Sequence, residues 1–181
     1  MSAEAYVNEV MKFRKALNLT SINDPAVFYD RFILPSIAIA EWMPETGRML
    51  DIGSGMGVPG IPLLIAKPNL TGVLVERRKK RAEFIRHVVR KLGLTAEVYD
   101  ADINDLPCLH VDICVARAVT DEEVLLQMCT PHANKGAVAV FPVPLSHRPK
   151  HVVGWSIMAE HTIAIKGDHN DIQCIRCYQY D

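Results

Sequence analysis

Short apolar runs alternate with amphipathic stretches along most of the chain after Arg48. The apolar runs predict strands at residues 49–52, 72–76, 96–99, 112–116 and 137–141. The amphipathic stretches predict helices at residues 61–66 and 79–92, and a capping box at residues 120–123 predicts a third helix through Met128. Such alternation of strand and helix implies a parallel sheet with right-handed crossovers.

The two ends of the chain follow different patterns. Residues 3–17 predict an amphipathic helix, and Asp24-Pro25 predicts the start of a second one that runs towards Trp42 and is interrupted at Pro35. Residues 157–165 and 172–178, joined by a polar turn at 166–171, predict a β-hairpin. We therefore expect one α/β domain with a Rossmann-like, mostly parallel sheet. Residues 1–46 form an N-terminal helical cap, and residues 47–181 form the core with its C-terminal hairpin.

The segment at residues 50–62, Leu-Asp-Ile-Gly-Ser-Gly-Met-Gly-Val-Pro-Gly-Ile-Pro, carries most of the chemical information. It joins an apolar strand to an apolar helix start through Gly53, Gly55, Gly57 and Gly60. Glycines allow a positive φ and a close approach of backbone N–H groups to a ligand. The next predicted strand ends in Glu76, whose carboxylate could hold ribose hydroxyls. This pattern predicts a nucleotide-type cofactor site.

Two cofactors fit the glycine pattern to different degrees. Gly55-x-Gly57-x-x-Gly60 matches the dinucleotide fingerprint, but Asp51 would place negative charge near a pyrophosphate, and Pro59 lacks an N–H. S-adenosylmethionine carries a sulfonium and an ammonium and no phosphate, so it is compatible with Asp51. The segment is similar to the first motif of class I methyltransferases. We therefore predict S-adenosylmethionine, with NAD(P) as the alternative.

The charge of the chain is nearly balanced, with a formal net charge of −1 over 181 residues. A nucleic-acid partner would therefore need a local basic patch. The run at residues 77–81 is interpreted as the solvated face of a helix. The segment at residues 147–151 follows the fifth strand, at the sheet edge where ligands bind, so Arg148 and Lys150 are predicted to contact RNA.

Metal-binding, membrane-spanning and secreted proteins are not indicated. The five cysteines and seven histidines show no ligand spacing or disulfide framework, so no metal is predicted. No apolar run approaches the ~20 residues that span a bilayer, and no signal peptide is evident. The composition predicts a soluble cytoplasmic protein.

Five segments, taken together, resemble one family. Residues 18–25, 31–36, 53–63, 80–85 and 116–118 match in order the pattern of the RsmG (GidB) family, the bacterial small-subunit ribosomal RNA guanine-N7 methyltransferases. The resemblance runs from about residue 7 to residue 140, and the Pro-Gly-Ile-Pro extension of the glycine loop is its most specific part. It implies a class I methyltransferase fold, S-adenosylmethionine as methyl donor, and ribosomal RNA or the small ribosomal subunit as partner.

The resemblance also implies roles for single residues. Gly53 and Val58 would line the methionine end of the cofactor, and Glu76 would hold the ribose. The remaining predicted cofactor residues are Asp51, Gly55, Gly57, Asp102, Ile103, Asn104 and Arg117. Ile103 and Asn104 fall where the family meets the adenine. Arg117 is the one predicted catalytic residue, because a guanidinium matches the acceptor edge of guanine; a structural ion pair with Asp112 or Asp51 is its alternative role.

The chain departs from the family pattern on the side where RNA should enter. Phe32 and Pro35 stand where the family usually has a histidine and an aspartate, Asp102 replaces an arginine, and Pro142 replaces a lysine. These departures leave two other functions open. One is a methyltransferase for another RNA or a small molecule, and the other is a cofactor-binding protein that transfers no methyl group.

Overall fold

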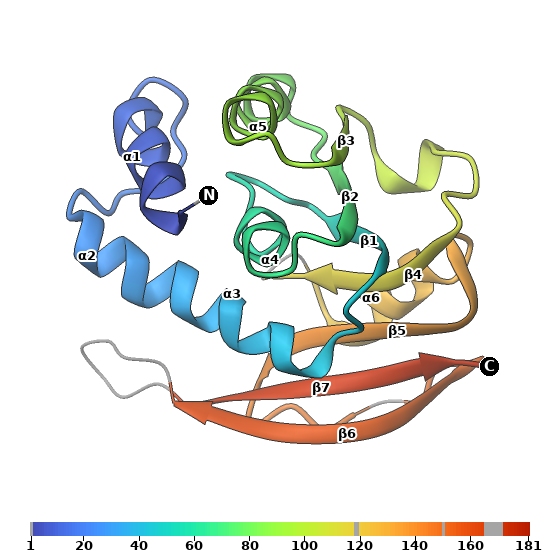
Figure 1. Ribbon diagram of the computed structural model, residues 1–181. Coiled ribbons are helices and arrows are strands. Elements are labelled where there is room, and N and C mark those ends of the chain that lie inside the picture. The colour runs from blue at the N-terminus through green and yellow to red at the C-terminus, as the bar shows by residue number, and fades with distance from the viewer. Residues whose placement is uncertain (1, 118–119, 150, 165–171) are drawn as a thin grey trace.

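The computed structural model describes residues 2–117, 120–149, 151–164 and 172–181. These residues form a seven-stranded sheet with the order β3-β2-β1-β4-β5-β7-β6 (Figure 1). Its strands are β1 (Gly47–Ile52), β2 (Leu70–Val75), β3 (Ala96–Tyr99), β4 (Val111–Ala116), β5 (Ala133–Pro144), β6 (Trp155–Ala164) and β7 (Ile172–Tyr180). Strands β1 to β5 are parallel, and β7 runs antiparallel between β5 and β6.

The five parallel strands and the C-terminal hairpin confirm the predicted sheet. Strand β5 is longer than predicted because β7 pairs with it from Val138 to Pro144, and β7 comes from far along the chain. Apolar alternation within residues 137–141 could not indicate that partner. The predicted polar turn lies in residues 165–171, outside the described part of the chain.

The helices lie where the periodicity predicts them, with differences at their ends. The main ones are α1 (Ala3–Phe13), α4 (Gly60–Ala66), α5 (Lys79–Leu92) and α6 (Glu122–Cys129). The predicted capping box is wrong, since α6 takes Asp121 as its N-cap and has no side-chain cap hydrogen bond. Its first residue, Glu122, forms instead a buried ion pair with Arg176 of β7, which fixes the helix start by a tertiary contact.

The predicted interruption at Pro35 takes the form of a change in helix type. A continuous rod runs through α2 (Pro25–Phe28), the π-helical turn η1 (Tyr29–Ile33), α3 (Leu34–Ile39) and the 3₁₀ turn η2 (Ala40–Trp42) (Figure 1). Pro35 has no N–H to donate to the carbonyl of Arg31, four residues earlier, so that carbonyl is left for another donor. Arg117, which belongs to the functional site described below, donates a hydrogen bond to this carbonyl.

The sheet is covered on both faces by separate apolar cores. Along β1, Met49 belongs to the core that contains α1, the rod, α4 and α5, whereas Leu50 and Ile52 belong to the core under α6. This alternation follows from the two-residue repeat of a strand. The helical cap and α4 therefore share one face of the sheet with Asp51, and they meet near its carboxyl edge.

Helix α1 is attached to α5 by a buried carboxylate. Glu9 accepts a hydrogen bond from Lys91 at 2.5 Å and lies 2.6 Å from Nε2 of His87. Phe13 packs edge-on against His87 and Phe84. The hydrogen bond from Lys91 is the main reason that the pKa of Glu9 lies below its ordinary value of 4.5.

We predict that Glu9→Gln lowers the free energy of unfolding at neutral pH by about 1 kcal/mol, a modest value because both basic partners are partly exposed. Since the pKa is lowered in the folded state, this stabilisation is complete above pH 4.5 and is lost as the pH falls below it. Urea unfolding at several pH values measures the difference. An unchanged gap between wild type and variant down to pH 3 would contradict this account.

Candidate functional site

The glycine loop between β1 and α4 has a backbone that other residues would strain. Gly53, Gly55 and Gly57 have φ values of +68°, +59° and +102°. A Cβ at Gly57 would lie 2.6 Å from Ile61, and one at Gly60 would lie 2.6 Å from Asp51 Oδ2. The first three glycines are therefore required by conformation, and Gly60 is required by close packing of helix on strand.

Contacts from three other elements hold this loop. The hydroxyl of Tyr6 in α1 donates to the carbonyl of Met56 at 2.8 Å. The backbone N–H of Ser54 donates to Val75 at the end of β2, at 3.0 Å. The N–H of Gly55 donates to the carboxylate of Glu76 at 2.9 Å. Tyr6 could not be predicted from sequence patterns, because its partner lies 50 residues away in the chain.

Asp51 lies beneath the loop with no exposed surface. Its Oδ2 accepts a hydrogen bond from the N–H of Gly60 at 3.1 Å, and Oδ1 has no partner among the described residues. Burial, helped by the nearby charge of Glu76, raises the pKa of Asp51 to about 7. Tyr6 is also fully buried, and this burial, together with the nearby charge of Asp51, raises the pKa of Tyr6 well above its ordinary value. Asp51 thus supports the loop from behind, and Gly57 shapes the loop through its positive φ.

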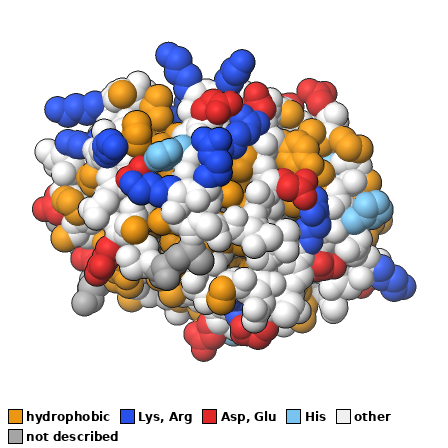
Figure 2. All heavy atoms as spheres, turned by 45° about the horizontal axis from the view of Figure 1, so that its top comes forward, with side chains coloured by type: hydrophobic (Ala, Val, Ile, Leu, Met, Phe, Trp, Pro, Cys, Tyr) orange, Lys and Arg blue, Asp and Glu red, His pale blue; other side chains and the backbone are white. Residues whose placement is uncertain are grey.

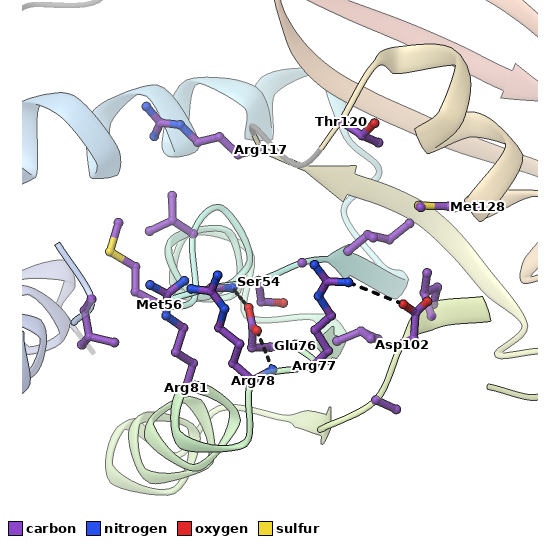
Figure 3. Close-up of a pocket in the computed structure, with 18 of the residues that line it drawn as sticks. Ser54, Met56, Glu76, Arg77, Arg78, Arg81, Asp102, Arg117, Thr120 and Met128 are labelled. Carbon is purple, nitrogen blue, oxygen red and sulfur yellow. Dashed lines mark hydrogen bonds and ion pairs between the residues drawn. The ribbon is translucent and has the colours of Figure 1, made fainter. Parts of the chain in front are cut away.

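In front of the loop is a cavity of about 490 Å³ at the carboxyl ends of β1, β2 and β4. In open α/β sheets this is the edge where ligands bind. Figure 3 shows Ser54 and Glu76 on one side of the cavity, Asp102 and Met128 on another, and Arg117 above. Its lining includes six predicted cofactor residues besides Arg117: Gly53, Gly55, Val58, Glu76, Asp102 and Ile103.

Two predicted residues at this end, Asp102 and Asn104, lie side by side. Asp102 lines the cavity and caps the 3₁₀ turn η3 (Ile103–Asp105) by accepting from the N–H of Asn104 at 3.1 Å. The side chain of Asn104 also donates to Asp102, at 2.9 Å. Asn104 is exposed and is not among the residues that line the cavity. The apolar part of this end comes from Ile52, Val75 and Ile103.

Arg117 lies against the helical rod. Its guanidinium carbon is 4.6 Å from the ring centre of Phe32, and Nη2 donates to the carbonyl of Arg31 at 2.9 Å. This is the carbonyl to which Pro35, four residues later, cannot donate. Nη1 is buried without a partner among the described residues. Burial, with the charge of Arg31, lowers the pKa of Arg117 to about 10. The side chain stays a cation at neutral pH.

Neither proposed ion pair of Arg117 is present. Asp112 instead accepts from the backbone of Arg48 and the side chain of Asn134, and Asp51 is bound to Gly60. One of the departures from the family pattern, Phe32, therefore contacts Arg117 directly, and another, Pro35, lies in the same helical rod. The sequence places these residues 82 or more positions from Arg117, so only the fold reveals the contact.

The two basic clusters lie differently from what the charge pattern predicts. Arg77, Arg78 and Arg81, interpreted as a solvated helix face, line the cavity. Arg148 lines a separate hollow with Asp121, Glu122 and Glu123, which are acidic neighbours. Lys150 lies outside the described residues. The sequence signal that could have placed the first cluster at the cavity is that the run at residues 77–81 directly follows Glu76, at the end of a strand.

The described residues show neither a metal-binding cluster nor a membrane-spanning helix. Within the described ranges, no three His, Cys, Asp or Glu side chains gather closely enough to hold a metal ion. Among those same residues, no helix combines the length and apolarity that crossing a bilayer requires.

The sheet order, the antiparallel β7 between β5 and β6, and the glycine loop after β1 define the class I methyltransferase fold. The chain matches the family model "GidB: rRNA small subunit methyltransferase G" over residues 1–141. It therefore belongs to the rRNA small subunit methyltransferase G family.

Curated relatives agree with this assignment, and a solved structure shares the fold. The chain is 31% identical to ribosomal RNA small subunit methyltransferase G of Chloroflexus aggregans, over 91% of this chain and 76% of that relative. It is 45% identical to the Xylella fastidiosa (strain M23) protein of the same name, over 50% of this chain and 42% of that relative. M. jannaschii TYW2, solved in complex with AdoMet, has a similar fold, with a TM-score of 0.63 and 14% identity over 81% of this chain and 74% of that one.

We predict that Asp51→Asn changes how stability depends on pH. Since burial raises the folded pKa from 3.8 to about 7, wild type loses stability as the pH rises through this interval, and a neutral side chain does not. Relative to wild type, the variant should therefore become more stable between pH 4 and pH 7. Parallel denaturant titrations measure this, and a stability difference independent of pH would contradict it.

We predict that Phe32→Leu lowers kcat for methyl transfer about fivefold, because it removes a cation–π contact of roughly 1 kcal/mol that orients Arg117. Phe32→Tyr keeps the ring and should retain wild-type kcat. Steady-state kinetics on both variants, with thermal unfolding as the folding control, measures the difference. Equal kcat for both variants would show that the ring does not position Arg117.

Proposed function

We propose that this protein transfers a methyl group from S-adenosylmethionine to N7 of a guanine in small-subunit ribosomal RNA. Family membership supports the reaction and the kind of substrate. The observation that carries the proposal in this chain is the cavity in front of the glycine loop. One wall carries an acidic residue at a strand end, and another carries an arginine with an unmatched donor.

The cavity fits the proposed methyl donor. Gly55 lines it, and a Cβ there would meet no protein atom closer than 3.8 Å, so the missing side chain leaves room at the cavity wall. Glu76 lines the cavity and is 6% exposed, and each of its oxygens accepts from one backbone N–H, so further lone pairs can accept from ribose hydroxyls. Ile52, Val75 and Ile103 provide an apolar surface suited to a purine ring.

We assign the parts of the site accordingly. Gly53, Gly55 and Val58 face the methionine end, Glu76 holds the ribose, and Asp102 and Ile103 border the adenine. Asp51 acts through the loop that it supports, and Gly57 acts through the shape that it gives the loop. Asn104 contributes through its hydrogen bonds to Asp102.

S-adenosylmethionine supplies an electrophilic methyl group on a positively charged sulfur. Guanine N7 has a free lone pair and no proton, so this chain needs no general base for the transfer. Its task is to place N7 correctly and to exclude other orientations of the base. Arg117 can do this by donating from Nη1 to O6 of guanine, which leaves N7 free.

The partner in this proposal is ribosomal RNA, either free or within the small ribosomal subunit. The protein would accordingly act in the cytoplasm, where ribosomal RNA is made and assembled in bacteria. The other open possibilities, another RNA, a small molecule, or cofactor binding without transfer, are outcomes of the test below.

The test measures transfer of labelled methyl groups to hypomethylated small-subunit RNA, offered free and as ribosomal particles. We predict label at a guanine N7 in wild type and about 100-fold less transfer by Arg117→Ala, the loss expected when one positioned donor is removed. Cofactor affinity, measured by calorimetry with S-adenosylhomocysteine, separates loss of binding from loss of transfer. Label on another atom, or no label with the cofactor bound, would overturn the proposed substrate.

A further inference from the structure

Basic side chains are unevenly compensated along α5 and the residues before it. In its second half, Arg86 pairs with Glu83 and Asp100, and Lys91 pairs with Glu9. At its start, Arg77 has only a long contact of 3.9 Å to Asp102. For the Arg78 side chain, no hydrogen bond or ion pair is found among the described residues. Positive charge therefore accumulates at the beginning of the helix.

This beginning of α5 is the end that faces the cavity. Arg77, Arg78 and Arg81, which we call the arginine rim, all line the cavity, whereas Arg90 at the other end does not. Figure 3 shows the rim along one side of the cavity and Arg117 on the opposite side. Figure 2 shows that Lys and Arg side chains also gather on the surface that carries α1 and α5.

The positive charge at the start of α5 lowers the stability of this helix. The first turn of α5 has no acidic residue, its N-cap is Arg78, and no side chain caps it. Cations at a helix N-terminus oppose the macrodipole and destabilise the helix. Such a local conflict is expected where function requires the charge. An anion at the rim would remove the conflict.

We propose that the arginine rim binds phosphates of the RNA backbone next to the target guanine. This rests on the proposed function and adds the direction from which RNA enters: the base between the rim and Arg117, and its backbone along the start of α5. Arg77 and Arg78 are exposed and can reach a phosphate directly. Arg81 is partly fixed, since its Nη2 donates to the carbonyl of Asn18 at 2.7 Å.

Of the two basic clusters, this one fits RNA phosphates better. Arg148 shares its hollow with Asp121, Glu122 and Glu123, of which Glu122 is paired with Arg176, and acidic neighbours weaken the attraction of an anion. Among the described residues that line the cavity with the rim, Glu76 and Asp102 are acidic, and the backbone N–H groups of Gly55 and Arg78 already hydrogen-bond to Glu76. Phosphate contacts fix register without reading sequence, so the rim would position the RNA and Arg117 would orient the base.

The test compares Arg78→Ala and the double variant Arg77→Ala/Arg78→Ala with Arg90→Ala. Arg90 is an exposed arginine of the same helix that lies away from the cavity, so it controls for net charge. The affinity for a small-subunit RNA fragment is measured by fluorescence anisotropy at several salt concentrations. Methyl-transfer kinetics, S-adenosylhomocysteine calorimetry and thermal unfolding are measured on the same proteins.

We expect the slope of log affinity against log salt to fall by about 0.7–0.9 for Arg78→Ala and by about twice that for the double variant, as for one and two lost phosphate contacts. Arg90→Ala should keep the wild-type slope. KM for RNA should rise in the rim variants, with kcat and S-adenosylhomocysteine affinity unchanged.

Two results would overturn the arginine rim as a phosphate site. One is an equal slope and affinity for Arg78→Ala and Arg90→Ala. The other is a loss of S-adenosylhomocysteine affinity without a change in RNA affinity, which would place the rim in the cofactor site. RNA binding is measured without methyl transfer, so failure of the proposed reaction in wild type is detected separately.

Discussion

The functional site depends on one constraint, which is that the glycine loop after β1 must hold a backbone conformation that leaves its front face open. Gly53, Gly55 and Gly57 provide that conformation because all three have a positive φ, which is costly for any other residue. Tyr6, Val75 and Glu76 hold the loop through hydrogen bonds from or to its backbone. Asp51 fixes the first N–H of α4 from beneath. The loop is thus stabilised from the cap, the neighbouring strand and its own strand.

The helical cap is therefore part of the site as well as a cover for one face of the sheet. Through Tyr6 it reaches the back of the loop, and through Phe32 and the Arg31 carbonyl it holds Arg117 across the cavity. Pro35 makes that carbonyl available by removing a helical hydrogen bond. The departures from the family pattern at Phe32 and Pro35 create a particular setting for the same arginine. Arg117 contacts the ring of Phe32 and the carbonyl of Arg31, in a region where the family usually has polar side chains.

Much of the fold could be predicted from the sequence because its signals are local. The strands β1 to β5 follow from apolar runs, α5 from its periodicity, and the cofactor loop from four closely spaced glycines and the distal Glu76. Contacts between distant segments could not be predicted. The Tyr6 hydrogen bond, the packing of Phe32 on Arg117 and the Glu122–Arg176 pair each join segments 50 or more residues apart. The charge run at residues 77–81 was visible, but its orientation towards the cavity depends on how α5 leaves β2.

The central claim is that the loop and the cap together form an S-adenosyl site. Calorimetric titration of the protein with S-adenosylhomocysteine, and in parallel with NAD, tests it most directly, because the glycine pattern and Glu76 taken alone fit both cofactors. The account predicts saturable binding of one S-adenosylhomocysteine per chain and no measurable binding of NAD. Tighter binding of NAD, or no binding of S-adenosylhomocysteine by the folded protein, would contradict it.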